Sequence, residues 1–205
     1  MAEVELFLVR HGETAWNAER RFQGQSDVPL SERGRLQAAT IASALRSIPF
    51  THAYASDLQR ATETAQAVVA GRSLSVQADT RLREFDFGAW EGLTWAQIIE
   101  RWPEFDQRLP TQPRRYEPVG GERFEHVIAR VRAFLDELVA NVTGGYALIV
   151  THAGALHAAM EVLAPEGFDP LGMVFSTAGI SRIAMEDGRA RIITQNDVSH
   201  LDSLT

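Results

Sequence analysis

The sequence predicts one α/β domain built on a mainly parallel sheet. Short apolar segments alternate with amphipathic ones along the chain, as in domains that cover a parallel sheet with helices. A length of 205 residues suits one large domain, and such a domain buries about 70% of the surface of its unfolded chain. No internal repeat and no linker divides the chain.

Apolar spacing and capping residues predict the elements of the first half. The run Val4–Val9 is apolar throughout and ends at Arg10, as a buried strand would. Ser31 can cap a helix, and Thr94-Trp95-Ala96-Gln97 has the spacing of a capping box. We expect strands at residues 4–9, 51–55 and 74–77, and helices from Ser31 to about Leu45, from Ser56 to about Val69 and from Thr94 to about Trp102.

The second half contains the most regular helical pattern, at Arg123–Val142. Its apolar residues recur at i, i+3, i+4 and i+7, and Gly144-Gly145 follows as a stop signal. We expect a strand over 146–151, a helix over 156–163, and a hairpin whose strands 180–185 and 191–195 flank Glu186-Asp187-Gly188.

Two stretches are rich in loop-forming residues, Arg20–Leu30 and Pro103–Gly121. The second contains four prolines and ends with Gly120-Gly121. A structureless stretch of this length in a compact domain is often functional. We expect it to form a lid or insert over one end of the sheet; the alternative is a surface loop without a role.

Composition excludes several classes of function. The chain has no cysteine, which rules out disulfides and a cysteine nucleophile. A net charge of −7 argues against a nucleic acid or an anionic membrane as a partner. No apolar run is long enough to span a membrane, and the N-terminus lacks the basic region of a signal peptide. We therefore expect a cytoplasmic protein.

Two predicted strands end in histidine. The first leads into Arg10-His11-Gly12, and the strand over 146–151 leads into His152-Ala153-Gly154. Because ligands of open parallel sheets bind beyond the carboxyl ends of the strands, we expect His11 and His152 to meet over one pocket. Arg60, near the start of the helix after the second strand, would add a cation, and backbone N–H groups of Ala153 and Gly154 could help to bind an anion. Two arginines and two imidazoles at one point suit a phosphoryl group.

A histidine that attacks phosphorus must be neutral and held in one tautomer. Expelling an alkoxide near neutral pH also requires a proton donor. The candidate donor is Glu84, in the stretch from Leu82 to Gly92. The residues themselves leave three other carboxyl groups open for this role: Asp86, Glu91 and Glu13.

The chain resembles the histidine phosphatase superfamily, which includes the cofactor-dependent phosphoglycerate mutases. The likeness covers nearly the whole chain. Five groups of residues carry it in order: Arg10-His11-Gly12-Glu13-Thr14 with Trp16-Asn17; Gln23-Gly24 with Asp27, Pro29-Leu30 and Gly34; Ser56–Ala61 with Thr64-Ala65; Glu84 with Gly88 and Glu91-Gly92; and Thr151-His152-Ala153-Gly154. The first motif alone is moderately specific, and the five together are highly specific.

The resemblance implies a three-layer α/β/α sandwich and a division of labour among the site residues. His11 would accept the phosphoryl group, while Arg10, Arg60 and His152 would bind its oxygens. Glu84 would be the general acid and later the base that activates water. The expected pocket lining comprises Asn17, Gln23, Gly24 and Ala153, and the pair Arg114 and Arg115 would grip a second anionic group or lie solvated in a loop. The resemblance implies no metal and no organic cofactor.

The expected activity is hydrolysis of a small phosphorylated metabolite through a phosphohistidine, by a monomer or a homodimer. The alternatives are a phosphoglycerate mutase, an α-ribazole phosphatase of cobalamin synthesis, or a non-enzymatic binder of phosphorylated ligands. Mutases carry a tyrosine and a lysine beyond the glutamate, whereas this chain has Phe87 and no lysine. The stretch Phe85–Gly92 resembles the α-ribazole phosphatases.

Overall fold

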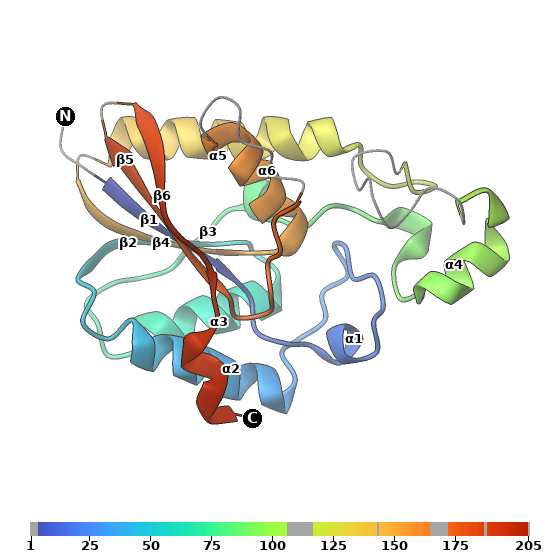
Figure 1. The fold of residues 1–205 in the computed structure, drawn as a ribbon, viewed down its shortest axis with the longest axis horizontal. Coiled ribbons are helices and arrows are strands. Elements are labelled where there is room, and N and C mark those ends of the chain that lie inside the picture. The colour runs from blue at the N-terminus through green and yellow to red at the C-terminus, as the bar shows by residue number, and fades with distance from the viewer. Residues whose placement is uncertain (1–3, 106–116, 143, 165–171, 187, 205) are drawn as a thin grey trace.

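A six-stranded sheet lies at the centre of the molecule, between two layers of helices (Figure 1). The computed structural model describes residues 4–105, 117–142, 144–164, 172–186 and 188–204. The strands are β1 (Val4–Arg10), β2 (Phe50–Ala55), β3 (Gln77–Ala78), β4 (Gly145–Thr151), β5 (Ile180–Glu186) and β6 (Arg189–Asp197). The α-helices are α1 (Ala15–Ala18), α2 (Glu32–Ala44), α3 (Gln59–Val69), α4 (Trp95–Arg101), α5 (Phe124–Asn141) and α6 (Ala153–Leu163), and the 3₁₀-helices are η1 (Thr80–Leu82), η2 (Gly88–Trp90), η3 (Pro103–Phe105) and η6 (Ser199–Leu204).

The strand order is β3-β2-β4-β1-β5-β6. The first four of these strands run parallel, while β5 is antiparallel to β1 and to β6. The prediction of a mainly parallel sheet is therefore confirmed, and the predicted hairpin forms the antiparallel edge. Its turn residue Asp187 lies outside the described residues.

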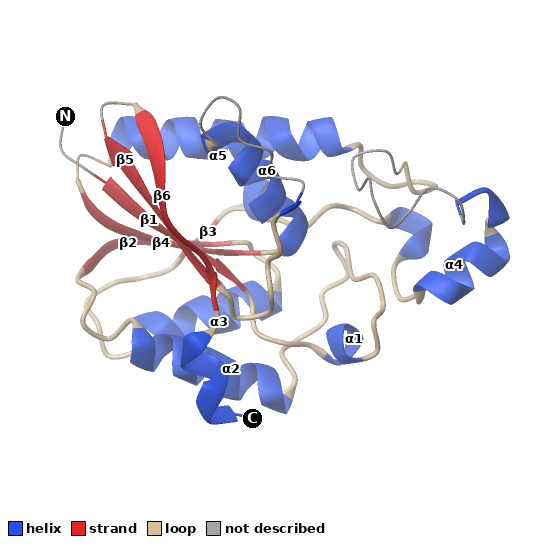
Figure 2. Cartoon of the chain, viewed as in Figure 1, coloured by secondary structure: helices blue, strands red, loops and turns tan. Residues whose placement is uncertain are grey.

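Successive residues of β1 face opposite layers, as the period of a strand requires. Leu6 and Leu8 belong to the core that α5 and α6 cover, whereas Phe7 and Val9 belong to the core that α2 and α3 cover. Figure 2 shows these helix pairs on opposite sides of the strands. This arrangement is the three-layer α/β/α sandwich that the family resemblance implies.

Several element boundaries differ from prediction, and three of them lie near the site or the sheet edge. Strand β3 begins at Gln77 rather than at residue 74 and has only two residues. Helix α3 begins at Gln59, since the hydroxyl of Ser56 accepts from the N–H of Leu58 and holds a short turn before the helix. Helix α6 begins at Ala153, directly after His152.

Helix α1 and the short 3₁₀-helices are absent from the predictions because apolar periodicity cannot report elements of one turn. A reciprocal capping box between Thr14 and Asn17 holds α1. The predicted capping box of Thr94 and Gln97 is present and starts α4. Among the described helices, none is long and apolar enough to cross a membrane.

Candidate active site

The two predicted strand-end histidines lie together. Strands β1 and β4 are parallel neighbours, and their register pairs Arg10 with Thr151, so the residues that follow leave the same edge of the sheet. The backbone N–H of His11 donates to the carbonyl of Thr151 over 3.0 Å. The ring centroids of His11 and His152 are 5.0 Å apart. Residues that are remote in sequence thus form one site.

His11 is held as a neutral imidazole in one tautomer. Its Nδ1 lies 2.7 Å from the carbonyl oxygen of Gly12. A carbonyl can only accept, so Nδ1 carries the proton and Nε2 keeps its lone pair. Burial, followed by the charges of Arg60 and Arg10, lowers the pKa of His11 well below the ordinary 6.5. The ring is therefore uncharged near neutral pH, and the lone pair of Nε2 is available.

The loop after His11 requires glycine at position 12. The N–H of Gly12 donates to the hydroxyl of Thr64 over 3.1 Å, and this hydroxyl donates to the carbonyl of Arg60 over 2.7 Å. A Cβ atom at position 12 would lie 2.5 Å from the carbonyl oxygen of Gly34. Contact with α2 and α3 on both sides thus fixes the backbone beside His11.

Arg60 is completely buried and joins three segments. Its Nε donates to Nδ1 of His152 over 3.2 Å, and its two terminal nitrogens donate to the carbonyls of Ser26 and Gly24 over 2.8 and 2.7 Å. Burial lowers the pKa of Arg60 to about 10, against the raising effect of nearby carboxylates, with Glu84 first among them. The guanidinium therefore remains charged at neutral pH.

His152 is a neutral hydrogen-bond donor. Because Nδ1 accepts from Arg60, the ring proton lies on Nε2. Burial first, then the charge of Arg60, lowers the pKa of His152 well below 6.5. Nε2 is buried and has no hydrogen-bond partner within the described ranges. A phosphoryl oxygen beside His11 is an acceptor of the kind that this donor lacks.

The loop over residues 175–179 holds Arg10, which sequence reasoning did not foresee. A terminal nitrogen of Arg10 donates to the carbonyl of Phe175 over 2.7 Å, and its backbone N–H donates to Gly179 over 3.1 Å. The N–H of Ala178 donates to the carbonyls of Arg10 and His11, both at 3.1 Å, and Ala178 has a φ of 61°. Left-handed backbone at a non-glycine residue is costly, so tertiary contacts impose this conformation.

Glu84 lies beside the start of α6. Its Oε1 accepts from the backbone N–H of Gly154 over 2.9 Å and from that of Phe85 over 2.8 Å. A Cβ atom at position 154 would lie 2.3 Å from Oε1, so only glycine leaves room for the carboxyl group. The amide of Gly154 thus holds Glu84 rather than facing the cavity as an open anion-binding donor.

The three other carboxyl candidates are engaged in loops. Glu91 accepts from the N–H groups of Gln25 and Ser26 over 2.8 and 2.9 Å. Asp86 accepts from the N–H of Gly88, and Glu13 accepts from the hydroxyl of Ser31. None of the three lines the cavity beside His11, whereas Glu84 does. Position therefore favours Glu84 as the proton donor.

A cavity of about 260 Å³ opens above these groups. Its wall consists of Arg10, His11, Asn17, Arg20, Arg21, Phe22, Gln23, Gly24, Arg60, Glu84, Phe87 and Ala153. The predicted lining residues Asn17, Gln23, Gly24 and Ala153 are all present. Sequence reasoning missed Arg20, Arg21, Phe22 and Phe87; the position of the first three between Asn17 and Gln23 was the available signal. His152 is not among the residues that line the cavity, but its ring lies beside that of His11, which does.

Two further observations bear on the predicted ligands. Arg114 and Arg115 lie outside the described residues. Across the described part of the chain, no group of three or more His, Asp or Glu side chains could hold a metal ion.

Comparison with known proteins places this geometry in a family. The sequence pattern of the histidine phosphatase superfamily (branch 1) matches residues 6–198 of this chain. A probable phosphoglycerate mutase of Salmonella paratyphi A is 33% identical over an alignment of 206 positions, which covers 98% of this chain and 96% of the relative. The solved structure of a mycobacterial glucosyl-3-phosphoglycerate phosphatase is 33% identical with a TM-score of 0.85, over 94% of this chain and 98% of that one. The solved structure of the α-ribazole phosphatase from Shigella flexneri is 27% identical with a TM-score of 0.85, over 94% of this chain and 96% of that one.

Matches of this extent confirm the resemblance seen in the sequence. The family description spans nearly all of the chain, from within β1 to the residue before η6. The similar proteins include two phosphatases and a probable mutase, and each of these matches covers at least 94% of both chains. The protein belongs to branch 1 of the histidine phosphatase superfamily.

Proposed function

We propose that the protein is a phosphomonoesterase that hydrolyses small phosphorylated metabolites through a phosphohistidine on His11. One observation carries this proposal. The neutral His11, with its Nε2 lone pair free, lines the same cavity as the cations Arg10 and Arg60 and the carboxyl group of Glu84. Nucleophile, anion-binding groups and proton donor are thus within one small space.

The first step forms the phosphohistidine. The Nε2 lone pair of His11 attacks phosphorus, the bond from phosphorus to the ester oxygen breaks, and the carboxyl group of Glu84 gives its proton to that oxygen. Arg10, Arg60 and the Nε2–H of His152 donate to the phosphoryl oxygens and stabilise the charge of the transition state. Nδ1 of His11 keeps its proton throughout this step, so the phosphohistidine ring is cationic, and the carbonyl of Gly12 continues to accept that N–H.

The second step releases phosphate. A water molecule gives a proton to the carboxylate of Glu84 and attacks phosphorus, and the bond from phosphorus to Nε2 breaks. Glu84 is then protonated and His11 is neutral again, so the site returns to its starting state. No electron acceptor and no further reactant are needed.

Hydrolysis is favoured over mutase activity because the chain lacks two residue types that the family resemblance associates with mutases. The family resemblance associates mutases with a tyrosine and a lysine beyond the glutamate, but Phe87 lines the cavity and the chain has no lysine. Phosphoglycerate mutase activity is the second candidate, because a relative that matches nearly the whole chain bears that name. An α-ribazole phosphatase is a third, on the similarity of a solved structure of that name.

The substrate class follows from the cavity. A space of about 260 Å³ with arginines in its wall suits a small anionic metabolite. The lid role of 103–121 remains a prediction; within its described part, the carbonyl of Val119 accepts from the N–H of Ala89, close to the Glu84 segment. A cytoplasmic monomer or homodimer likewise remains a prediction.

The test is to trap the intermediate. After brief exposure to a phosphorylated substrate and an alkaline quench, the intact protein should gain the mass of one phosphoryl group. His11→Ala should abolish both this adduct and phosphate release, whereas His126→Ala, an exposed histidine on α5, should leave both unchanged. Substantial turnover in His11→Ala would overturn the proposal, and neither adduct nor phosphate release across a metabolite panel would favour a non-enzymatic binder.

A further inference from the structure

The segment that carries Glu84 has no regular secondary structure to hold it. It runs from the end of η1 at Leu82 to the start of η2 at Gly88, beside the N-terminal half of α5. A general acid must keep its reach toward the leaving oxygen within tenths of an ångström. Another part of the chain must therefore fix this backbone.

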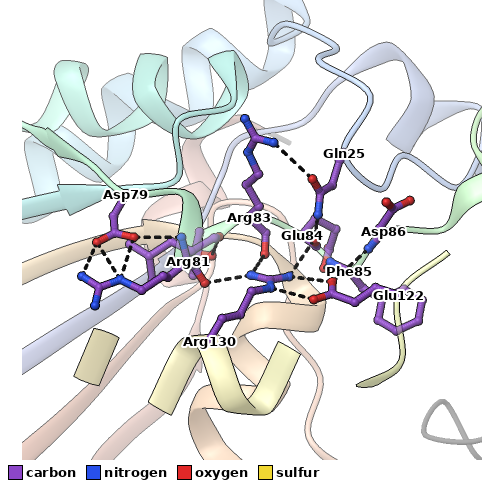
Figure 3. Close-up of polar contacts among 11 residues, drawn as sticks. Gln25, Asp79, Arg81, Arg83, Glu84, Phe85, Asp86, Glu122 and Arg130 are labelled. Carbon is purple, nitrogen blue, oxygen red and sulfur yellow. Dashed lines mark hydrogen bonds and ion pairs between the residues drawn. The ribbon is translucent and has the colours of Figure 1, made fainter. Parts of the chain in front are cut away.

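Arg130 on α5 fixes it with all five of its N–H groups (Figure 3). One terminal nitrogen donates to the carbonyls of Arg81 and Arg83 over 2.7 and 2.6 Å, and the other donates to the carbonyl of Glu84 over 2.9 Å. The remaining two N–H groups form a fork onto the carboxylate of Glu122, with distances of 2.9 and 3.0 Å. One side chain thus satisfies three backbone carbonyl groups of the segment around Glu84.

Glu122 binds the same segment beyond the acid. Its backbone N–H donates to the carbonyl of Asp86 over 2.9 Å, and its Oε2 lies 3.4 Å from the N–H of Asp86. Arg130 and Glu122 therefore bracket Glu84 from residue 81 to residue 86. Both side chains are largely buried, at 18% and 15% exposed, so this ion pair is shielded from the solvent that weakens surface pairs.

The chemistry of the clamp demands arginine. A guanidinium presents five N–H donors in a rigid plane, while the ammonium of lysine has three donors around one point. Lysine could preserve the charge and one or two bonds but not the simultaneous hold on residues 81, 83, 84 and 122. The acidic partner neutralises the buried charge, so the clamp adds no net cation beside the phosphoryl site.

We propose that Arg130 and Glu122 are positioning residues that set the reach of the Glu84 carboxyl group toward the leaving oxygen. Neither residue lines the cavity, so they act through the backbone of the Glu84 segment and not on the substrate. This inference rests on the proposed function, in which Glu84 is the general acid. If the ion pair were merely structural, breaking it would lower the stability of the fold and leave the proton transfer unaltered.

The leaving group distinguishes these two roles. An alkyl phosphate needs a proton on its leaving oxygen, whereas nitrophenyl phosphate does not. In Arg130→Lys we expect kcat/KM for the alkyl ester to fall on the order of 10²-fold, mainly through kcat, because small displacements of catalytic groups cost about that much. For nitrophenyl phosphate we expect a loss within about 3-fold, since general acid catalysis contributes little to it. The ratio kcat/KM is used because it reports phosphoryl transfer to His11 and not the later hydrolysis.

Glu84→Gln supplies the reference. It should show the same selectivity for the alkyl ester, and adding Arg130→Lys to it should cause little further loss, because the two changes disable one function. If Glu84→Gln shows no selectivity, the acid assignment of the proposed function fails. If it does but Arg130→Lys lowers both esters equally, or the losses multiply in the double variant, only the positioning inference fails.

Two further variants guard against a folding defect. Arg132→Lys makes the same change on an exposed face of α5 and should be silent in both assays. Glu122→Gln keeps the size of the side chain but loses the charge opposite Arg130. It should also act selectively on the alkyl ester, with a smaller loss of kcat/KM of about 10-fold. Should Arg130→Lys fail to fold, an unselective loss in folded Glu122→Gln overturns the inference.

Discussion

Nε of Arg60 donates a hydrogen bond to Nδ1 of His152 over 3.2 Å, across 92 residues of sequence. The same guanidinium holds the carbonyls of Gly24 and Ser26. One buried side chain therefore determines the tautomer of His152, anchors the loop that lines the cavity and provides positive charge beside His11. Each of these contributions requires the planar shape of arginine as well as its charge.

Arg60→Lys should consequently lose activity although it preserves the charge. Lysine cannot hold three partners in different directions, so His152 would lose the bond that orients it. We expect kcat/KM to fall on the order of 10²-fold, the usual cost of removing an organised donor from a transition state. Arg46→Lys, on the exposed surface, is the matched control. Activity within about 2-fold of the unchanged protein would contradict the role assigned to this guanidinium.

Gly154→Ala should displace the acid without weakening the helix. A Cβ atom there would lie 2.3 Å from Oε1 of Glu84 and 3.2 Å from Cβ of Phe85. Alanine is a better helix former than glycine by about 1 kcal/mol, so α6 itself should not suffer. We expect turnover of alkyl phosphates to fall about 10-fold or more. In Gly172→Ala, where a Cβ atom meets none of the described residues within 4 Å, turnover should be unchanged; equal behaviour of the two variants would count against this geometry.

The stability of the fold should decrease as the pH falls below about 6.5. Burial lowers the pKa of His11 and of His152 in the folded state, while the unfolded chain keeps their ordinary values. The unfolded state therefore binds protons first, and the free energy of unfolding rises with pH through this range. Each such histidine contributes a slope of up to about 1.4 kcal/mol per pH unit.

Urea unfolding at pH 7.5, 6.5 and 5.5 measures this slope. His11→Gln should unfold with a smaller pH dependence over the same range, because one of the two low-pKa imidazoles is gone. An unchanged slope would show that His11 titrates alike in both states. His126→Gln, at an exposed position, serves as the control.

With 2,3-bisphosphoglycerate and either monophosphoglycerate, we expect phosphate release to exceed interconversion of the two isomers. A mutase must retain the bisphosphorylated ligand and keep water from the phosphohistidine, which takes extra cations and a tight lid. Phe87 has no polar group to offer the second phosphate. Product analysis with phosphate detection is the measurement, and rapid interconversion with little free phosphate would assign the chain to the mutases instead.

Short-range patterns in the sequence were sufficient for the framework. The apolar run before Arg10-His11 and the run before His152 predicted two strands, and the rule for open parallel sheets predicted that their ends would meet. The pattern of α5 is equally local: Phe124, Val127, Val131, Phe134, Leu135 and Leu138 are all buried. These features depend on residue spacing that repeats within one element, and such spacing can be read directly.

The hydrogen bonds that tune the site depend on the path of the whole chain. Nothing in the sequence near residue 10 indicates that the loop over 175–179 holds Arg10, and nothing near residue 84 indicates that Arg130 binds this segment. Nor does the sequence around Gly154 indicate that its amide binds Glu84. The sequence by itself determined the two strands that lead into His11 and His152 and the sheet edge at which both histidines lie. Only the tertiary structure decided the tautomers, the oxygen that Gly154 binds and the clamp on the acid. The physical reason is that these bonds join elements brought together by packing, and no local periodicity encodes such a pairing.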